Sequence, residues 1–173
     1  MEPFRYKPLT GSNSTRVFKL SPWGGHILKG SLMEVDLDSR PSYEAASYSW
    51  GGEPLSRYLI CEGRTIPISP TCEAFLRQVR RNFVTRSLWV DIICIDQSSV
   101  AERNLQVFSM DKIYSRAQRT LVWLGEGNAR SEVAFEILEW LALIPLMPKK
   151  IAGRVADLDF DGTKSRFALH HKS

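Results

Sequence analysis

The sequence is poor in the residues that build redox and metal sites. Its 173 residues include 3 cysteines and 3 histidines, and no two cysteines stand in a C-x-x-C pair. An odd number of cysteines without such a pair gives little support to a disulfide framework or a zinc site. We therefore predict a protein of a reducing compartment that binds no metal and no permanent cofactor, with its cysteines serving mainly as small core residues.

The motifs of common nucleotide-binding and hydrolytic enzymes are also missing. There is no G-x-x-x-x-G-K-[ST] loop and no G-x-S-x-G elbow, and the GEG at 125–127 only partly matches a G-x-G-x-x-G turn. These absences argue against P-loop nucleotide hydrolases and triad hydrolases. Any catalysis would then depend on carboxylates, which the chain has in quantity.

Long hydrophobic runs are absent as well. The first ten residues lack the apolar stretch of a signal peptide, and the apolar run at 140–147 contains Pro145 and is too short to span a bilayer. We expect a soluble, cytoplasmic protein without a membrane span.

Charge is mildly basic, with 23 Lys and Arg against 19 Asp and Glu. The densest basic run has Arg77, Arg80, Arg81 and Arg86. It is either a solvated helix face or a phosphate-binding patch, and we favour the first and predict no nucleic-acid partner.

The first half of the chain reads as strands. Residues 16–20, 26–37, 43–50, 57–61 and 65–69 are apolar or β-branched segments bounded by turn formers. Glu62-Gly63-Arg64 separates the last two segments and predicts a hairpin.

The second half alternates between helix and strand. Ser69-Pro70 begins a helix, residues 88–95 read as a buried strand, and Ser99-x-x-Glu102 has the form of a capping box. Val107, Met110, Ile113, Tyr114 and Ala117 then mark the core face of one helix, followed by a buried strand at 120–124 and a helix at 131–144. This order predicts an α/β fold with a mixed, mainly parallel sheet flanked by helices. We divide the chain into a flexible lead-in (1–15), a single domain (16–148) and a loosely ordered tail (149–173).

Three polar loops follow predicted strands, at 50–53, 96–99 and 125–128. In open α/β sheets ligands bind beyond the carboxyl ends of strands. Trp50 is the best candidate to stack on a planar ligand. Asp91 stands inside the predicted strand, where it requires an ion pair with Arg103 or Arg116, or a bond to a loop backbone. Glu102 is explained by helix capping alone.

Two blocks of sequence resemble signatures of the fungal heterokaryon-incompatibility (HET) domain family. Residues 43–51 (YEAASYSWG) resemble its Y-x-A-L-S-Y-x-W-G signature, and residues 88–97 (LWVDIICIDQ) resemble its L-W-I-D-A-[IL]-C-I-N-Q block. The pattern continues in order through Glu102, Arg103, Gln106, Val107, Met110, Ile113, Tyr114, Ala117 and residues 122–125. Ala46 and Asp96 depart from it, replacing Leu and Asn.

This resemblance implies a cell-death effector used in fungal non-self recognition, with self-association and an upstream sensor as partners. It also implies a distant similarity to TIR domains, some of which hydrolyse NAD. Laid over this chain, the TIR pattern puts a catalytic glutamate near Glu136, with Glu132 and Glu139 as neighbours. The alternative is a non-catalytic module that recruits partners.

Two arguments predict the site residues: ligands of open α/β sheets bind beyond the carboxyl ends of the strands (the strand-end rule), and the sequence resembles the HET family. We predict Glu136, Glu102 and Asp91 as catalytic carboxylates and NAD as the substrate. The predicted ligand-binding residues are Tyr48, Trp50, Gly51, Asp96, Gln97, Arg103 and Gly125.

Overall fold

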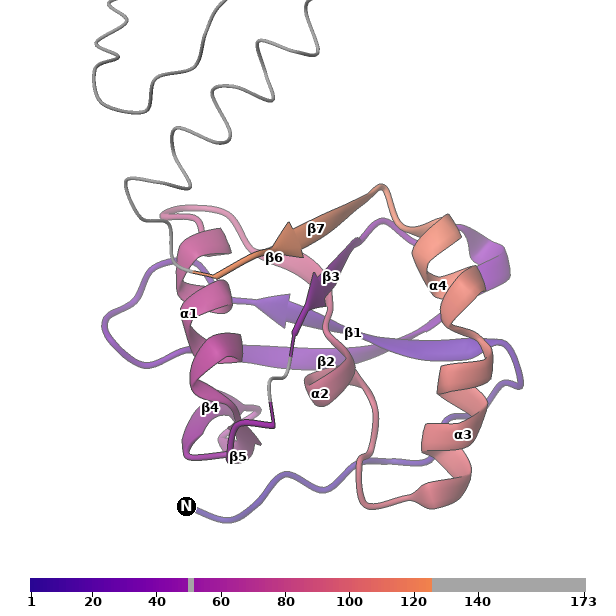
Figure 1. Ribbon diagram of the computed structural model, residues 1–173, viewed down its shortest axis with the longest axis horizontal. Helices are drawn as coiled ribbons and strands as arrows, with labels where there is room; N and C mark the ends of the chain where they lie inside the picture. Colours follow the sequence, from indigo (N-terminus) through magenta and orange to yellow (C-terminus); the bar gives the residue numbers. More distant parts are fainter. Residues whose placement is uncertain (50–51, 126–173) are drawn as a thin grey trace, which may run out of the picture. The chain divides into compact units, whose positions relative to one another are not determined.

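A seven-stranded mixed sheet forms the centre of the molecule in the computed structural model, which describes residues 1–49 and 52–125 (Figure 1). Its strands are β1 (Ser14–Leu20), β2 (Lys29–Asp36), β3 (Glu44–Tyr48), β4 (Arg57–Cys61), β5 (Arg64–Ile68), β6 (Arg86–Trp89) and β7 (Arg119–Trp123), in the order β5-β4-β2-β1-β6-β3-β7. Three pairings are parallel (β2–β4, β3–β6 and β3–β7) and three are antiparallel. The predicted α/β fold with a mixed sheet is confirmed.

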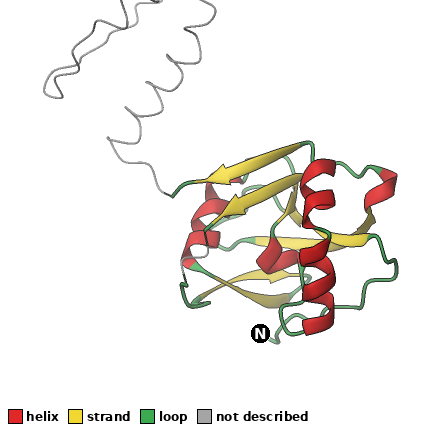
Figure 2. Cartoon of the chain, turned by 45° about the vertical axis from the view of Figure 1, so that its right-hand side comes forward, coloured by secondary structure: helices red, strands yellow, loops and turns green. Residues whose placement is uncertain are grey.

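Within the described residues four α-helices flank the strands, and in both ribbon views β3 and β7 lie between α1 and α4 (Figures 1 and 2). They are α1 (Pro70–Val79), α2 (Asp91–Cys94), α3 (Val100–Phe108) and α4 (Met110–Arg116), with a short 3-10 turn, η1 (Leu37–Ser39), after β2. The predicted start of α1 is confirmed, because the Ser69 side chain accepts from the Cys72 N–H (3.1 Å) and Pro70 occupies the first turn.

The predicted hairpin joins β4 and β5. Glu62 and Gly63 both have positive φ (51° and 79°), as a type I′ turn requires. This turn twists in the same sense as the strands that it connects, so it sets the β4–β5 register.

The prediction of a continuous strand at 88–95 is wrong. β6 ends at Trp89 and Asp91 begins α2, where the backbone N–H of Ile95 donates to the Asp91 oxygen (3.1 Å). A run that is apolar at every position but Asp91 has no clear period that distinguishes a strand from a buried helical turn. Tertiary contacts favour the turn here: Tyr6 donates to the Ile93 oxygen (2.9 Å) and Arg16 to the Cys94 oxygen (3.1 Å).

The single helix expected after Ser99 is two helices that meet at Ser109. The core face was also partly misassigned, because Val107 is 56% exposed while Gln106 is buried. Gln106 accepts from the Thr15 hydroxyl (2.7 Å) and donates to the Ser14 oxygen (2.9 Å), so hydrogen bonds to β1 make a polar residue suitable for the interface.

β7 forms as expected, but it is not the buried strand that was predicted. Among the described strands it pairs with β3 alone, and Val122 is 64% exposed. An edge strand lacks the second neighbour that would cover it. The most buried strand is β1, which pairs with both β2 and β6 and has only Lys19 partly exposed.

The segment before β1 lies against the sheet. Pro3 pairs with Thr65, the Phe4 N–H donates to the Thr65 oxygen (2.8 Å), and Phe4 and Tyr6 pack on the core. Among residues 1–49 and 52–125, no helix has the length and apolar character needed to cross a bilayer.

Candidate functional site

The carboxyl ends of β3, β6 and β7 meet at one edge of the sheet, because these neighbouring strands are parallel. Tyr48 ends β3, Trp123 ends β7, and Asp91 comes two residues after the end of β6. Phe75 of α1 stacks on Tyr48 (ring centroids 6.0 Å apart) and meets Trp123 edge-on (6.2 Å). Aromatic rings and a carboxylate thus gather at the edge where ligands of open α/β sheets bind.

The Tyr48 hydroxyl at this edge is a neutral group. Burial raises the pKa of Tyr48 far above its usual value, and the nearby Cys72 and Asp91 raise it further. Burial also raises the pKa of the Cys72 thiol to about 12. Because the thiolate is the reactive form of cysteine, Cys72 is not an activated nucleophile.

Asp91 is held by the backbone at the start of α2. Its Oδ1 accepts from the N–H of Ile92 (2.7 Å), and its main-chain oxygen accepts from the Gln97 side-chain amide (3.1 Å). The sequence analysis offered Asp91 an ion pair or a bond to a loop backbone, and the backbone bond seen here is to the adjacent residue of α2. Asp91 lies beside the Tyr48 hydroxyl and bonds to Gln97, and of these three residues only Gln97 belongs to a loop that the strand-end rule had picked.

Glu102 lies in a different environment, opposite a buried arginine that the sequence analysis did not single out. The Arg16 guanidinium donates to both Glu102 oxygens (2.5 and 3.0 Å), and the Asp96 N–H donates to Oε1 (2.8 Å). Only half of the predicted capping box forms: the Ser99 hydroxyl accepts from the Glu102 N–H (3.3 Å), but the Ser99 N–H donates to the Asp96 oxygen (3.1 Å). The explanation of Glu102 by capping alone is therefore wrong, because its carboxylate faces Arg16. The signal in the sequence was Arg16 itself, because an arginine within a predicted buried strand requires an acidic partner.

Of the remaining predicted ligand-binding residues, Asp96 and Arg103 lie next to Gln97. Asp96 accepts from the N–H (3.0 Å) and hydroxyl (2.6 Å) of Ser98, while Arg103 donates to the Gln97 oxygen (3.2 Å). Gly125 follows β7 with φ of 105°. The residues outside the described ranges are Trp50, Gly51, Glu132, Glu136 and Glu139.

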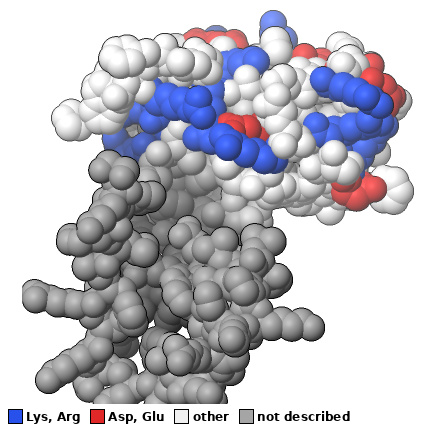
Figure 3. All heavy atoms as spheres, turned by 90° about the horizontal axis from the view of Figure 1, so that it is seen from above, with Lys and Arg blue, Asp and Glu red and all other residues white. Residues whose placement is uncertain are grey.

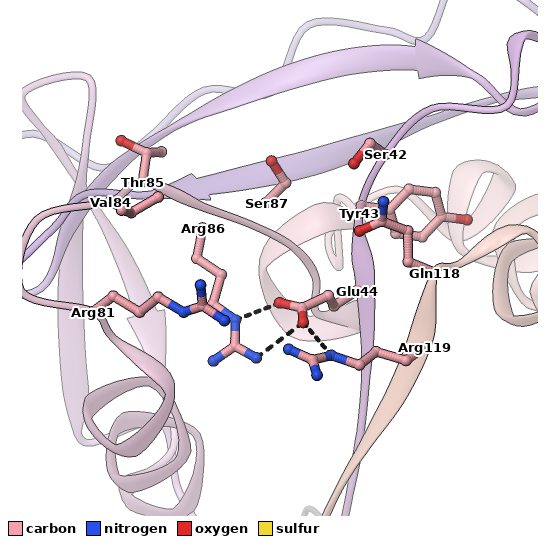
Figure 4. Close-up of a pocket in the computed structure, with 10 residues that line it drawn as sticks. All are labelled: Ser42, Tyr43, Glu44, Arg81, Val84, Thr85, Arg86, Ser87, Gln118 and Arg119. Carbon is pink, nitrogen blue, oxygen red and sulfur yellow. Dashed lines mark hydrogen bonds and ion pairs between the residues drawn. The ribbon is translucent and has the colours of Figure 1, made fainter.

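A second site, which sequence reasoning missed, lies at the opposite ends of the same strands (Figure 4). It is a hollow of about 430 Å³. Its lining residues are Ser42, Tyr43, Glu44, Arg81, Val84, Thr85, Arg86, Ser87, Gln118 and Arg119. The Gln118 N–H donates to the Tyr43 oxygen (2.8 Å), which joins the starts of β7 and β3.

Glu44 occupies the centre of this hollow, and its side chain is 10% exposed. Arg86 donates to its carboxylate through Nε and through Nη2 (3.0 Å), and Arg119 donates through Nε. The hydrogen bonds from Arg86 and Arg119 hold the pKa of Glu44 below its usual range against the opposing effect of burial. Glu44 is therefore ionised at neutral pH.

A strand-end rule points to the carboxyl edge and so passes over this hollow. The sequence signal that could have revealed this hollow was the presence of Arg81 and Arg86 in the basic run. Seen from above the view of Figure 1, basic side chains gather around a small acidic patch (Figure 3).

Within residues 1–49 and 52–125, no cluster of His, Cys, Asp and Glu could hold a metal ion.

Comparison with known proteins gives these sites a family context. The family model described as heterokaryon incompatibility protein (HET) matches residues 43–154. Heterokaryon incompatibility protein 6, OR allele, of Neurospora crassa is 33% identical over 142 residues, covering 64% of this chain and 21% of the relative. The chain thus spans about a fifth of that relative's length. No solved structure shows significant similarity to the chain. The match includes β3, β6, α2 and both strand ends described above, and the chain belongs to the heterokaryon incompatibility (HET) family.

Proposed function

We propose that the chain is an effector domain of fungal heterokaryon incompatibility and triggers cell death after non-self recognition. Family membership supports this role, together with the relative whose printed name refers to heterokaryon incompatibility. On the resemblance to the family, an upstream sensor domain or protein would supply the trigger. In this proposal the domain acts in the cytoplasm, without nucleic acid, and self-associates when switched on.

The chemistry that we propose is cleavage of NAD on self-association. The bond between the nicotinamide nitrogen and ribose C1′ breaks, and its electron pair leaves with the neutral nicotinamide. Water adds at C1′ and releases a proton, so ADP-ribose is the second product. The ribose passes through an oxocarbenium-like state, which a nearby carboxylate stabilises as in glycosidases.

The observation that carries this proposal is the position of Asp91 beside the Tyr48 hydroxyl at the carboxyl ends of β3 and β6. Tyr48 and Trp123 are partly exposed and pack on the buried Phe75, and they offer aromatic surface for a planar ring. Glu136 remains the first choice for the catalytic carboxylate on the resemblance to TIR domains, with Asp91 second. Glu102 is the weakest candidate, because its carboxylate is neutralised by Arg16.

The test is to incubate the purified chain with NAD at high protein concentration with a crowding agent, and to measure nicotinamide by chromatography. Light scattering on the same samples reports self-association. Glu136→Gln should abolish nicotinamide release with little change in melting temperature, and Asp91→Asn should reduce release. Asp111→Asn, at an exposed position of α4, is the matched control and should retain full activity. An oligomeric protein that releases no nicotinamide would contradict the enzymatic proposal.

A non-catalytic recruiting module is the second candidate, and the surface of α3 favours it. Leu105 is 68% exposed and Phe108 is 88% exposed, and Val100 and Val107 are also more than half exposed. Exposed apolar side chains gathered on one short helix are typical of an interaction surface. In this case Leu105→Ser with Phe108→Ser should prevent cell death on expression in a fungal host, while Glu136→Gln should leave killing intact.

A further inference from the structure

The hollow around Glu44 holds more positive charge than its carboxylate can neutralise. Among the described residues, three guanidinium groups line it, from Arg81, Arg86 and Arg119, and Glu44 is the one acidic lining residue. The described lining thus carries an excess of two positive charges. Figure 4 shows all three arginine side chains directed toward Glu44.

The three arginines are not equivalent, because they differ in how many N–H groups are already bonded. Every nitrogen of the Arg86 guanidinium already makes a hydrogen bond: Nε and Nη2 bind Glu44, and Nη1 donates to the Val79 oxygen (2.7 Å). Its side chain is 13% exposed. Arg86 therefore links the end of α1 to β3 through hydrogen bonds that fix its side chain.

Arg119 and Arg81 retain donors. Arg119 binds Glu44 through Nε, and the described residues give no partner to its Nη1 and Nη2. The guanidinium of Arg81 likewise has no hydrogen-bond or ion-pair partner among the described residues, and Arg81 is exposed. Since a guanidinium has five N–H donors, these two side chains offer several unused donors at the hollow.

A hydroxyl adds to this donor set. Lys19 Nζ donates to the Ser87 hydroxyl oxygen (2.7 Å), which leaves the Ser87 hydroxyl hydrogen to donate elsewhere. Ser87 lines the hollow, as do Ser42 and Thr85. The same bond brings the Lys19 ammonium within reach of the rim.

We propose that this hollow binds the phosphate group of a small molecule. Paired guanidinium N–H groups match the oxygen geometry of phosphate, and Arg119 is held in place by Glu44 before a ligand arrives. A phosphate monoester carries about −1.5 to −2 charges at pH 7, which matches the excess of two positive charges. The ligand is free phosphate or the phosphate of a nucleotide, since both offer the same oxygens.

This site is separate from the proposed NAD-cleaving edge. Glu44 and Tyr48 are the first and last residues of β3, so the two sites lie roughly 13 Å apart along the strand. The proposal does not depend on NAD cleavage, and a chain that fails to release nicotinamide can still bind phosphate here.

The test is isothermal titration of the whole chain at low salt with two probes, inorganic phosphate and a nucleoside 5′-monophosphate. Arg81→Gln and Arg119→Gln should each weaken binding about tenfold, as expected for the loss of charge-assisted hydrogen bonds. Arg5→Gln is the matched control, because Arg5 is exposed and lies outside the hollow. It changes the net charge equally and should leave the dissociation constant unchanged.

The two probes distinguish the sources of the ligand. Equal affinity for both would assign the hollow to free phosphate, and tighter binding of the nucleoside monophosphate would assign it to nucleotides. Either result, combined with the effect of the arginine variants, supports the proposal. It is overturned if neither probe binds, or if Arg5→Gln weakens binding as much as Arg81→Gln and Arg119→Gln.

Discussion

Glu102 and Glu44 are both shielded carboxylates that bind arginine, and they differ in what surrounds the pair. Arg16, the partner of Glu102, is 6% exposed, donates to the oxygens of Cys94 and Lys7, and lies against the Tyr6 ring. Glu44 has two arginine partners, and one of them, Arg119, is 55% exposed. The first cluster is closed and the second is open toward solvent.

The comparison shows that the same ion pair can serve structure or recognition, depending on the donors that remain. The Arg16–Glu102 pair ties β1 to α3 and to the Asp96 loop, and its two charges cancel. At Glu44 the carboxylate holds two guanidiniums near each other, and positive charge is left over. Like charges kept close in a hollow require a counterion, which makes that cluster the better candidate for a ligand.

The largest expected effect is loss of the closed pair. Glu102→Gln leaves the buried Arg16 without its counter-charge, and we expect the free energy of unfolding to fall by about 3–5 kcal/mol. Urea denaturation followed by fluorescence measures this change. The control is Glu73→Gln, which breaks two pairs with the more exposed Arg57 and Arg77 and should cost about 1 kcal/mol or less. Equal losses in the two variants would show that the Arg16 site is not closed.

Loss of the open cluster should have a smaller effect on stability. Glu44→Gln removes the partner of Arg86, while the exposed Arg119 can return to water. We expect the free energy of unfolding to fall by about 2 kcal/mol in the same urea experiment. A loss as large as that of Glu102→Gln would mean that Arg119 is not free to be solvated, and the distinction between the two clusters would fail.

Acid should act on the open cluster in a defined direction. The pKa of Glu44 is lowered in the folded protein by Arg86 and Arg119, so its contribution to stability is full above the unfolded value of about 4.3 and is lost as pH falls below it. The difference in unfolding free energy between wild type and Glu44→Gln should therefore shrink from pH 6 to pH 3. A difference that stays constant over this range would contradict the assignment.

The smallest expected effect on stability is that of Arg119→Gln. Because Arg119 is more than half exposed, its ion pair should contribute less than about 1 kcal/mol to the free energy of unfolding. Its melting curve should nearly superimpose on that of wild type. A large loss of stability would place Arg119 among the structural arginines with Arg16.

Much of the fold followed from local signals. Ser69-Pro70 defined the start of α1, and Glu62-Gly63 defined the β4–β5 turn. Both depend on backbone geometry that a few neighbouring residues determine. The apolar run at 88–95 could not be assigned in the same way, because burial on all sides removes the period that separates helix from strand.

The candidate site was only partly predictable. The strand-end rule selected the loop that contains Gln97, whose side chain bonds to Asp91. It did not anticipate Asp91 beside Tyr48, because Asp91 was expected inside a strand and β6 ends before it. It could not find Arg16 opposite Glu102, because these partners are 86 positions apart in the chain. The Glu44 cluster depends in the same way on pairings of β3 with β6 and β7.

The sequence by itself determined the family, the alternation of strands and helices, and the local starts and turns, because these depend on residues within a few positions of one another. Tertiary structure alone decided which arginine faces which carboxylate, and whether the resulting cluster is closed or open. Those outcomes depend on the sheet order, which brings Arg86 and Arg119 from two different strands to the same side chain of Glu44.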